Sequence, residues 1–137
     1  MPRAHLQLVI LAVDDVARAR DFYVAAFGWR VTVDLPVYVE MALPGGTGVS
    51  VYQREGFAAN TRVAPTRSPA GGVGSAELYV AVDDLDDAVR RLRAAGAREL
   101  AAPEQKPWGD TAAYFADPDG HVVAVAVHPD EDAPASV

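Results

Sequence analysis

The sequence predicts an α+β fold built from two tandem β-α-β-β-β modules. The main support is an internal repeat, because residues 9–20 and residues 78–89 share one order: an apolar strand, two adjacent aspartates and a helix. The two copies align on Asp15 and Asp84, about half of the 137-residue chain apart. A repeat of that length indicates two similar modules that form one body.

The predicted organisation has four parts. Residues 1–54 form the first module, residues 55–75 a linker, residues 76–128 the second module, and residues 129–137 a disordered acidic tail. Half of the residues are apolar and 23% are charged, which is typical of a globular protein.

Charge and composition narrow the possible partners and compartment. The formal net charge of −7 disfavours nucleic acids and anionic membranes and favours cationic small molecules. The absence of cysteine suits a reducing compartment. No apolar run reaches membrane-spanning length, and Asp14 and Asp15 interrupt the pattern of a secretory signal, so we expect a cytoplasmic protein.

The first module begins with an apolar strand over residues 6–13. Asp14 and Asp15 then offer side-chain oxygens that cap a helix N-terminus. Apolar residues recur at helical spacing in the next segment, and Gly28 is suited to end that helix in the left-handed conformation. Three further strands are predicted over residues 29–33, 37–43 and 49–54.

The linker, residues 55–75, is rich in glycine, proline and alanine and has no hydrophobic period. Phe57 is its one aromatic residue. A loop of this length is typically functional or mobile.

The second module repeats the plan of the first. A strand is predicted over residues 76–82, followed by a helix that Asp84 caps and Gly96 ends. A loop at 103–110 carries Trp108, and the Asp-Pro-Asp-Gly sequence at 117–120 indicates a tight turn. The remaining strands are predicted over residues 98–101, 111–116 and 121–128.

Three motifs occur in an order that resembles a known family. They are Phe22-Tyr23 before Phe27-Gly28, then Pro107-Trp108-Gly109, then Phe115-Ala116-Asp117-Pro118-Asp119-Gly120. With the internal repeat, they resemble the vicinal oxygen chelate superfamily over about residues 5–128. That superfamily includes glyoxalase I, bleomycin-resistance proteins and extradiol dioxygenases. The resemblance implies that the modules form a curled mixed sheet, a cup with helices on its outer face, and that the protein is a homodimer.

Alternation along the strands predicts which side chains face the cup. In the 76–82 strand, Leu78, Val80 and Val82 are expected to pack on the helices, which leaves Glu77 and Tyr79 facing the cup. The cup-facing positions of the first and last strands are Leu8, Ile10, Ala12, Val122, Ala124 and Ala126. Small residues there favour a cavity over a filled core.

The resemblance also implies where metal ligands would stand in a metal-dependent relative. The positions fall on Leu8, Glu77 and Ala124, with a fourth near Ser50 or Tyr52. Leu8 and Ala124 cannot bind a metal, and one glutamate is not a metal site. His5, His121 and His128 lie away from these positions. We therefore predict no metal and no cofactor.

The leading hypothesis is a metal-free protein that binds, and sequesters, a small aromatic or cationic ligand. The predicted ligand-binding residues are Glu77, Tyr79, Trp108, Phe57, Tyr52, Tyr38 and Ala124. Trp108 is suited to stack on a flat ligand, but packing at an interface would also explain it. Two alternatives stay open: an enzyme, metal-dependent with displaced ligands (a lyase or dioxygenase) or metal-free with Glu77 as base, and a structural dimer with a vestigial cup.

Overall fold

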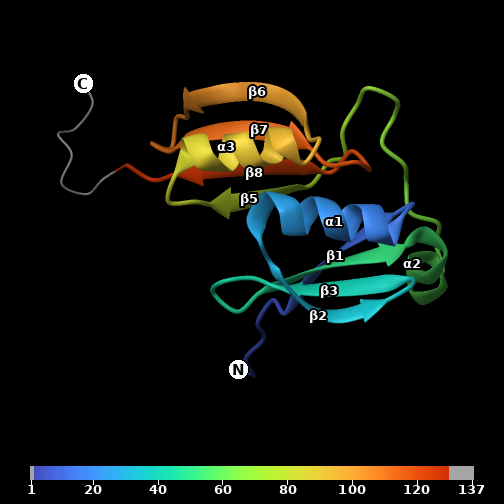
Figure 1. The fold of residues 1–137 in the computed structure, drawn as a ribbon. Helices are drawn as coiled ribbons and strands as arrows, with labels where there is room; N and C mark the ends of the chain where they lie inside the picture. The colour runs from blue at the N-terminus through green and yellow to red at the C-terminus, as the bar shows by residue number, and fades with distance from the viewer. Residues whose placement is uncertain (1, 130–137) are drawn as a thin grey trace.

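The computed structural model describes residues 2–129, which fold into two four-stranded mixed sheets and three helices (Figure 1). The first sheet has the order β1-β4-β3-β2 and the second the order β5-β8-β7-β6. Strand β1 is parallel to β4, and β5 is parallel to β8. The other neighbouring strands are antiparallel. The α+β fold of two tandem modules predicted from the internal repeat is therefore confirmed.

The first module comprises β1 (Leu8–Val13), α1 (Val16–Phe27), β2 (Arg30–Leu35), β3 (Tyr38–Ala42) and β4 (Gly48–Gln53). The second comprises β5 (Glu77–Ala81), α3 (Leu85–Ala94), β6 (Arg98–Gln105), β7 (Thr111–Ala116) and β8 (Val122–Val127). Helix α2 (Arg54–Thr61) lies between them. The predicted tail falls in residues 130–137, apart from Pro129, and so lies outside the described residues.

Asp15 and Asp84 cap the two main helices, as predicted. A carboxylate oxygen of Asp15 accepts from the backbone N–H of Arg18 at 3.0 Å, and Asp84 accepts from the N–H of Asp87 at the same distance. Gly28 ends α1 with φ +66°, and its N–H donates to the carbonyl of Val24. Both main helices thus begin at a predicted aspartate. Helix α1 ends at the predicted Gly28, whereas α3 has Ala95 as its C-cap, one residue before Gly96, which has φ +89°.

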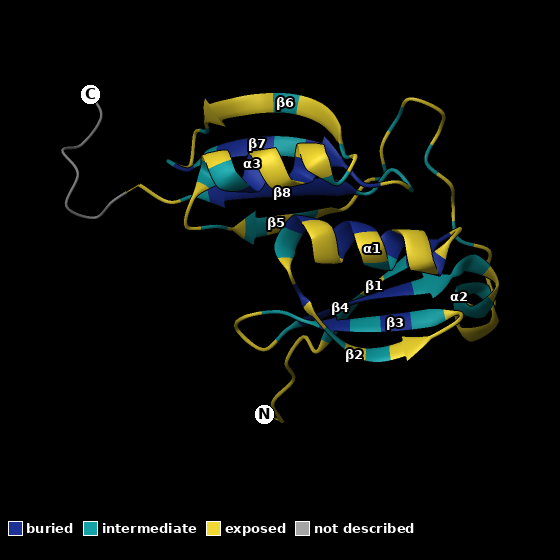
Figure 2. Cartoon of the chain, viewed as in Figure 1, coloured by how far each residue is buried: buried dark blue, intermediate teal, exposed yellow. Residues whose placement is uncertain are grey.

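One hydrophobic core serves both modules. Its largest fully buried side chains include Met41 in β3, Tyr23 in α1, Leu92 in α3 and Phe115 in β7, and α1 contacts α3 directly. Exposure rises toward the outermost strands, β2 and β6 (Figure 2). None of the helices in residues 2–129 is long and apolar enough to cross a membrane.

The prediction of an irregular linker is wrong at its start, because α2 occupies residues 54–61. This helix contains Gly56, which lowers helix propensity and obscured it in the sequence. A Cβ at Gly56 would lie 2.1 Å from a ring atom of Tyr52, so the glycine allows α2 to approach the Tyr52 ring closely. Another predicted boundary is also wrong, since β6 continues to Gln105 instead of ending at 101.

Strand parity follows the prediction on the helix side. Leu78, Val80 and Val82 pack against the core, and Glu77 and Tyr79 point the other way and are exposed. The small residues of β8 behave differently from the prediction. Ala124 has no exposed surface, because it lies between its register partners Tyr79 in β5 and Tyr114 in β7.

Candidate functional site

The face of the second sheet that points away from the helices carries most of the chemistry; we call it the open face. Directly paired residues in neighbouring strands lie on the same face of a sheet. Tyr79, Ala124 and Tyr114 are paired across β5, β8 and β7, and therefore share the open face. Glu77 precedes Tyr79 by two residues in β5 and therefore lies on the same face.

The loop before β7 places Trp108 at the edge of the open face. The backbone N–H of Lys106 donates to the carbonyl of Asp110, and Gly109 closes the turn with φ +102°. The Trp108 side chain packs edge-on against Tyr79, with ring centroids 6.4 Å apart. Its indole N–H donates to the Tyr79 hydroxyl at 2.9 Å, although the residue is 60% exposed.

Asp110 extends this contact into a hydrogen-bonded chain. The Tyr79 hydroxyl donates to one carboxylate oxygen of Asp110 at 2.6 Å, and the Nδ1 of His128 lies 2.6 Å from the other. The bond from Tyr79 and then that from His128 lower the pKa of Asp110. Burial and the bond to Asp110 raise the pKa of Tyr79. At neutral pH, these hydrogen bonds therefore join the ionised carboxylate of Asp110 to the neutral phenol of Tyr79.

Glu77 and Tyr114 occupy the part of the open face next to this chain. Burial, followed by the charges of Glu77 and Asp110, raises the pKa of Tyr114. Glu77 also borders a small apolar cleft of about 170 Å³ between β1 and β5. The ammonium of Lys106 lies 5.1 Å from the centroid of the Tyr114 ring and 4.0 Å from a carboxylate oxygen of Glu104.

The first sheet holds a separate group of predicted site residues. Tyr38 and Tyr52 pack edge-on with ring centroids 5.2 Å apart. The Tyr38 hydroxyl donates to Glu40 at 2.7 Å and lies 3.0 Å from the hydroxyl of Ser50, which is fully buried. Phe57 is partly buried in α2. The structure thus brings Tyr79 and Trp108 together, whereas Tyr38 and Tyr52 form a second group on the other module.

The register now places the fourth metal-ligand position. In the first sheet Leu8 of β1 pairs with Gly48 of β4, and in the second Glu77 of β5 pairs with Val122 of β8. Ser50 follows Gly48 by two residues, as Ala124 follows Val122, so Ser50 and Ala124 occupy equivalent positions. The set is therefore Leu8, Ser50, Glu77 and Ala124, which offers one carboxylate and one buried hydroxyl. This donor set does not fit a divalent metal ion. Within residues 2–129 no group of three or more His, Cys, Asp or Glu side chains is arranged to hold a metal.

A second Tyr-Asp-His group joins the two modules. The hydroxyl of Tyr23 in α1 donates to Asp117 at 2.6 Å, and Nδ1 of His121 lies 2.9 Å from the same carboxylate oxygen. Burial opposes ionisation of Asp117, but its hydrogen bonds with His121 and Tyr23 outweigh burial and lower its pKa. Tyr23 and Asp117 are both buried. This group therefore fixes α1 of the first module against the turn before β8.

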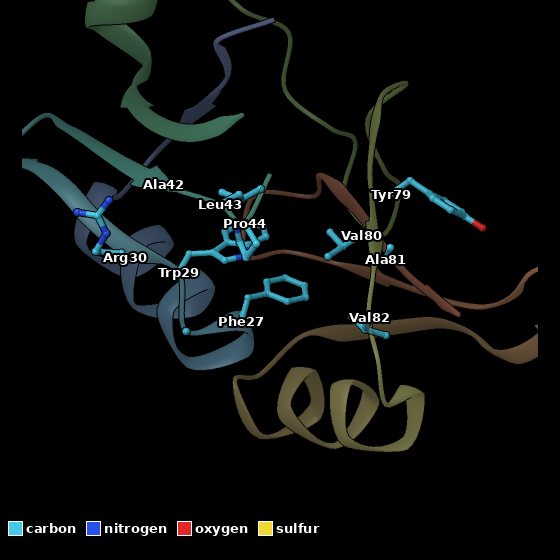
Figure 3. A pocket seen from close by; sticks show the side chains of 11 residues that line it. Phe27, Trp29, Arg30, Ala42, Leu43, Pro44, Tyr79, Val80, Ala81 and Val82 are labelled. Atoms are coloured by element: carbon cyan, nitrogen blue, oxygen red, sulfur yellow. The ribbon is translucent and has the colours of Figure 1, made fainter. Parts of the chain in front are cut away.

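A cleft of about 640 Å³ lies at the junction of the modules. It is lined by Phe27, Trp29, Leu43, Tyr79 and Val80, among others. In Figure 3 the Tyr79 ring extends away from Phe27 and Trp29, whereas Val80 points toward them. The junction cleft therefore adjoins the site that Tyr79 and Trp108 form, with the Tyr79 ring directed away from its aromatic side.

The sequence predicts Tyr79 and Trp108 as site residues but not the two polar residues that continue their hydrogen bond beyond Tyr79. Asp110 falls at the end of a predicted loop, and His128 lies away from the expected metal-ligand positions. Their pairing depends on the register of β7 and β8, which brings residues 110 and 128 to the same end of the sheet. The parity of β7 could have found Asp110, because it continues the alternation of Ala112 and Tyr114.

Two β-α-β-β-β modules with matching strand orders define the class of this protein as a paired-module α+β fold. The family model described as Glyoxalase/Bleomycin resistance protein/Dioxygenase superfamily matches residues 4–125. The chain belongs to this superfamily.

Curated relatives include a protein named for anthracycline biosynthesis. The anthracycline biosynthesis protein DnrV of Streptomyces peucetius is 29% identical over 127 residues, covering 84% of this chain and 44% of DnrV. The chain therefore spans less than half the length of that relative. The uncharacterised protein Mb0911c of Mycobacterium bovis is 31% identical over 117 residues, covering 81% of this chain and 75% of that protein.

Solved structures share the fold over nearly the whole chain. A glyoxalase-related enzyme from Fulvimarina pelagi matches with a TM-score of 0.80 and 24% identity, covering 97% of each chain. TioX from Micromonospora sp. ML1 matches with a TM-score of 0.64 and 29% identity, covering 91% of this chain and 99% of TioX. The first likeness concerns the fold alone.

Proposed function

We propose that the protein is a metal-free binding protein that sequesters a small aromatic ligand on the open face of the second sheet. The observation that carries this proposal is Trp108, an indole that is 60% exposed and yet held by a hydrogen bond to Tyr79. Because its N–H already has a partner, the ring presents apolar surface with no unsatisfied polar atom. Such a ring is suited to stack on a flat ligand.

The donor set at the metal-ligand positions supports a role without a metal. Leu8 and Ala124 have no donor atom, and the hydroxyl of Ser50 is engaged with Tyr38. The relatives support a flat ligand: DnrV is named for anthracycline biosynthesis, and anthracyclines contain a planar fused ring system. Sequestration would require only that the ligand is held, with no bond made or broken.

Calorimetric titration with the anthracycline daunorubicin tests the proposal. The wild-type protein is expected to bind, and Trp108→Ala to weaken binding about 10- to 100-fold, the effect of one lost aromatic anchor. Leu100→Ala is the matched control, because Leu100 is an exposed apolar residue in β6 of the same sheet. Elemental analysis is the second test, and a stoichiometric divalent ion in the purified protein would contradict a metal-free site.

A second candidate function is a metal-free enzyme with Glu77 as general base. It is favoured by the position of Glu77 between the open face and the apolar cleft at β1 and β5. If turnover of any bound ligand is detected, Glu77→Gln is expected to abolish it. Unchanged turnover in that variant would remove Glu77 from the mechanism.

We also propose that the protein is a homodimer. Strand β1 is at an edge of the first sheet and β5 at an edge of the second, and an edge strand offers unpaired backbone groups to a second copy. Sedimentation equilibrium of the purified chain tests it, and a monomeric mass at all concentrations would contradict it.

A further inference from the structure

The described part of the chain, residues 2–129, contains two Tyr-Asp-His groups with different surroundings. The Tyr23–Asp117 group is buried, and it fixes the two modules together. The Tyr79–Asp110 group has the same 2.6 Å bond between phenol and carboxylate, but it lies on the open face, where Tyr79 is 39% exposed. Its hydrogen-bonding residues all lie in the second module, and Tyr79 also accepts a hydrogen bond from the exposed indole of Trp108.

The direction of every hydrogen bond in the open-face chain is determined by Asp110. An ionised carboxylate only accepts, so Tyr79 must donate its proton to Asp110 and the Nδ1 of His128 must carry a proton. Since the Tyr79 proton is committed, its oxygen accepts the indole N–H of Trp108. The four side chains therefore form one directed series, from Trp108 through Tyr79 to Asp110, with His128 donating at the far end.

This direction leaves the open face with acceptors for a ligand. The Tyr79 oxygen retains a lone pair, and Glu77 is an exposed carboxylate on the same face. Asp110 is only 5% exposed and both of its oxygens already have a partner, so it acts on a ligand through Tyr79 and through its negative charge. The neighbouring cation, Lys106, lies over the Tyr114 ring and near Glu104. A ligand that donates hydrogen bonds or carries positive charge is thus matched, and an anionic ligand is repelled.

We propose that the series His128–Asp110–Tyr79–Trp108 makes the open face selective for aromatic ligands that carry a protonated amine. Trp108 stacks on the aromatic ring, and the ammonium group lies against the acceptors that Tyr79 and Glu77 present. Asp110 acts as a positioning residue, because it orients the Tyr79 hydroxyl and, through it, the indole. This assignment rests on the proposed function, since it names the class of ligand for the same site.

Three probes with one ring system and different charges test the selectivity. They are 2-naphthylmethylamine, which is a cation at neutral pH, 2-naphthylmethanol, which is neutral, and 2-naphthoate, which is an anion. Calorimetric titration of the full chain is expected to show affinity for the cation about tenfold above that for the alcohol, the effect of one charge-assisted contact. The anion is expected to bind more weakly than the alcohol.

Two variants separate positioning from simple loss of fold. Asp110→Asn keeps the shape but supplies a neutral amide, so the preference for the cation over the alcohol is expected to fall to about twofold or less. Tyr79→Phe breaks the link to Trp108, and we expect a smaller near-ultraviolet circular dichroism signal and weaker binding of all three probes. Asp86→Asn is the control for charge, because Asp86 is an exposed carboxylate in α3, on the other side of the sheet.

The outcomes distinguish this inference from the proposed function. Binding of none of the three probes would contradict the proposed function itself. Binding of all three with equal affinity, or best binding of the anion, would overturn the selectivity and leave the proposed function standing. An unchanged preference in Asp110→Asn, with the wild-type near-ultraviolet spectrum, would overturn the positioning role of Asp110.

Discussion

At the scale of single residues, the most consequential contact is the buried bond between Tyr23 and Asp117. Removing the phenol oxygen leaves a buried carboxylate without one of its donors, and such a loss costs more than a surface hydrogen bond. We expect Tyr23→Phe to lower the free energy of unfolding by about 1–3 kcal/mol, measured by urea denaturation. The control is Tyr114→Phe, which removes a hydroxyl from a partly exposed ring and should change stability by less than about 0.5 kcal/mol.

Asp117 also predicts how stability depends on pH. Its folded pKa lies below the ordinary value of about 3.9 for an unfolded chain, so its ionised form stabilises the fold above that pH. This stabilisation is lost as the pH falls below about 4 and through the folded pKa. Urea denaturation at pH 7 and at pH 3 should show a steeper acid loss for the wild type than for Asp117→Asn. Equal slopes would contradict the role of Asp117.

The residue scale is also where the sequence was least informative. Glu77 is predicted as a ligand-binding residue that faces the cup, and in the structure it is an exposed neighbour of the hydrogen-bonded series. Asp14 was predicted as a cap, but its carboxylate instead accepts from Arg54 and Arg67. These partners lie 40 and 53 positions away, so they become neighbours only after the strands and α2 are placed.

At the scale of elements, α2 is stabilised by its close approach to β4. Replacing Gly56 with alanine would favour the helix by about 1 kcal/mol, but the added Cβ would lie 2.1 Å from the Tyr52 ring. That ring is held by its contact with Tyr38, so moving it costs packing. We expect Gly56→Ala to be destabilising by about 1–2 kcal/mol in thermal unfolding. Asn60→Ala, at an exposed position of the same helix, should be neutral or stabilising.

The two N-terminal caps give a second prediction at this scale. Asp84→Ala is expected to lower stability by about 1 kcal/mol, because the N–H of Asp87 loses its acceptor. Asp83→Ala removes the adjacent carboxylate of the same pair and should have a smaller effect. An equal effect of both changes would contradict the assignment of Asp84 as the cap.

Elements with local signals were predicted well, and elements that depend on distant contacts were not. The main helices α1 and α3 are marked by their capping aspartates and apolar faces. Strand β7 was predicted at residues 111–116, as found, because a turn follows it immediately. Helix α2 has no buried residue of its own and a glycine in its first turn, so no hydrophobic period revealed it.

At the scale of the whole molecule, the shared core predicts that the two modules unfold together. Met41 lies in the first module and Leu92 in the second, and both are fully buried in one cluster. We expect Met41→Ala and Leu92→Ala each to cost about 2–5 kcal/mol and to shift a single unfolding transition. Far-ultraviolet circular dichroism and tryptophan fluorescence should give coincident curves. Two separate transitions would show that the modules are independent.

The internal repeat predicted the whole-molecule architecture because each copy carries its own strand, cap and helix. It could not show how the two copies differ in their outward-facing side chains after pairing. The strand pairing brings these side chains together: Ile10 and Glu40 flank Ser50 in the first sheet, and Tyr79 and Tyr114 flank Ala124 at the equivalent place in the second. The predicted site therefore spanned both modules, whereas Tyr79 and Trp108 belong to the second.

The matching registers of the two sheets give the molecule two equivalent frameworks. One half carries Tyr79 and Trp108, while in the other half Ile10, 41% exposed, stands where Tyr79 stands. Because β1 and β4 pair with the geometry of β5 and β8, the first sheet is a second scaffold of the same design. Protein engineers could evolve a new recognition surface on it while the original half keeps its own.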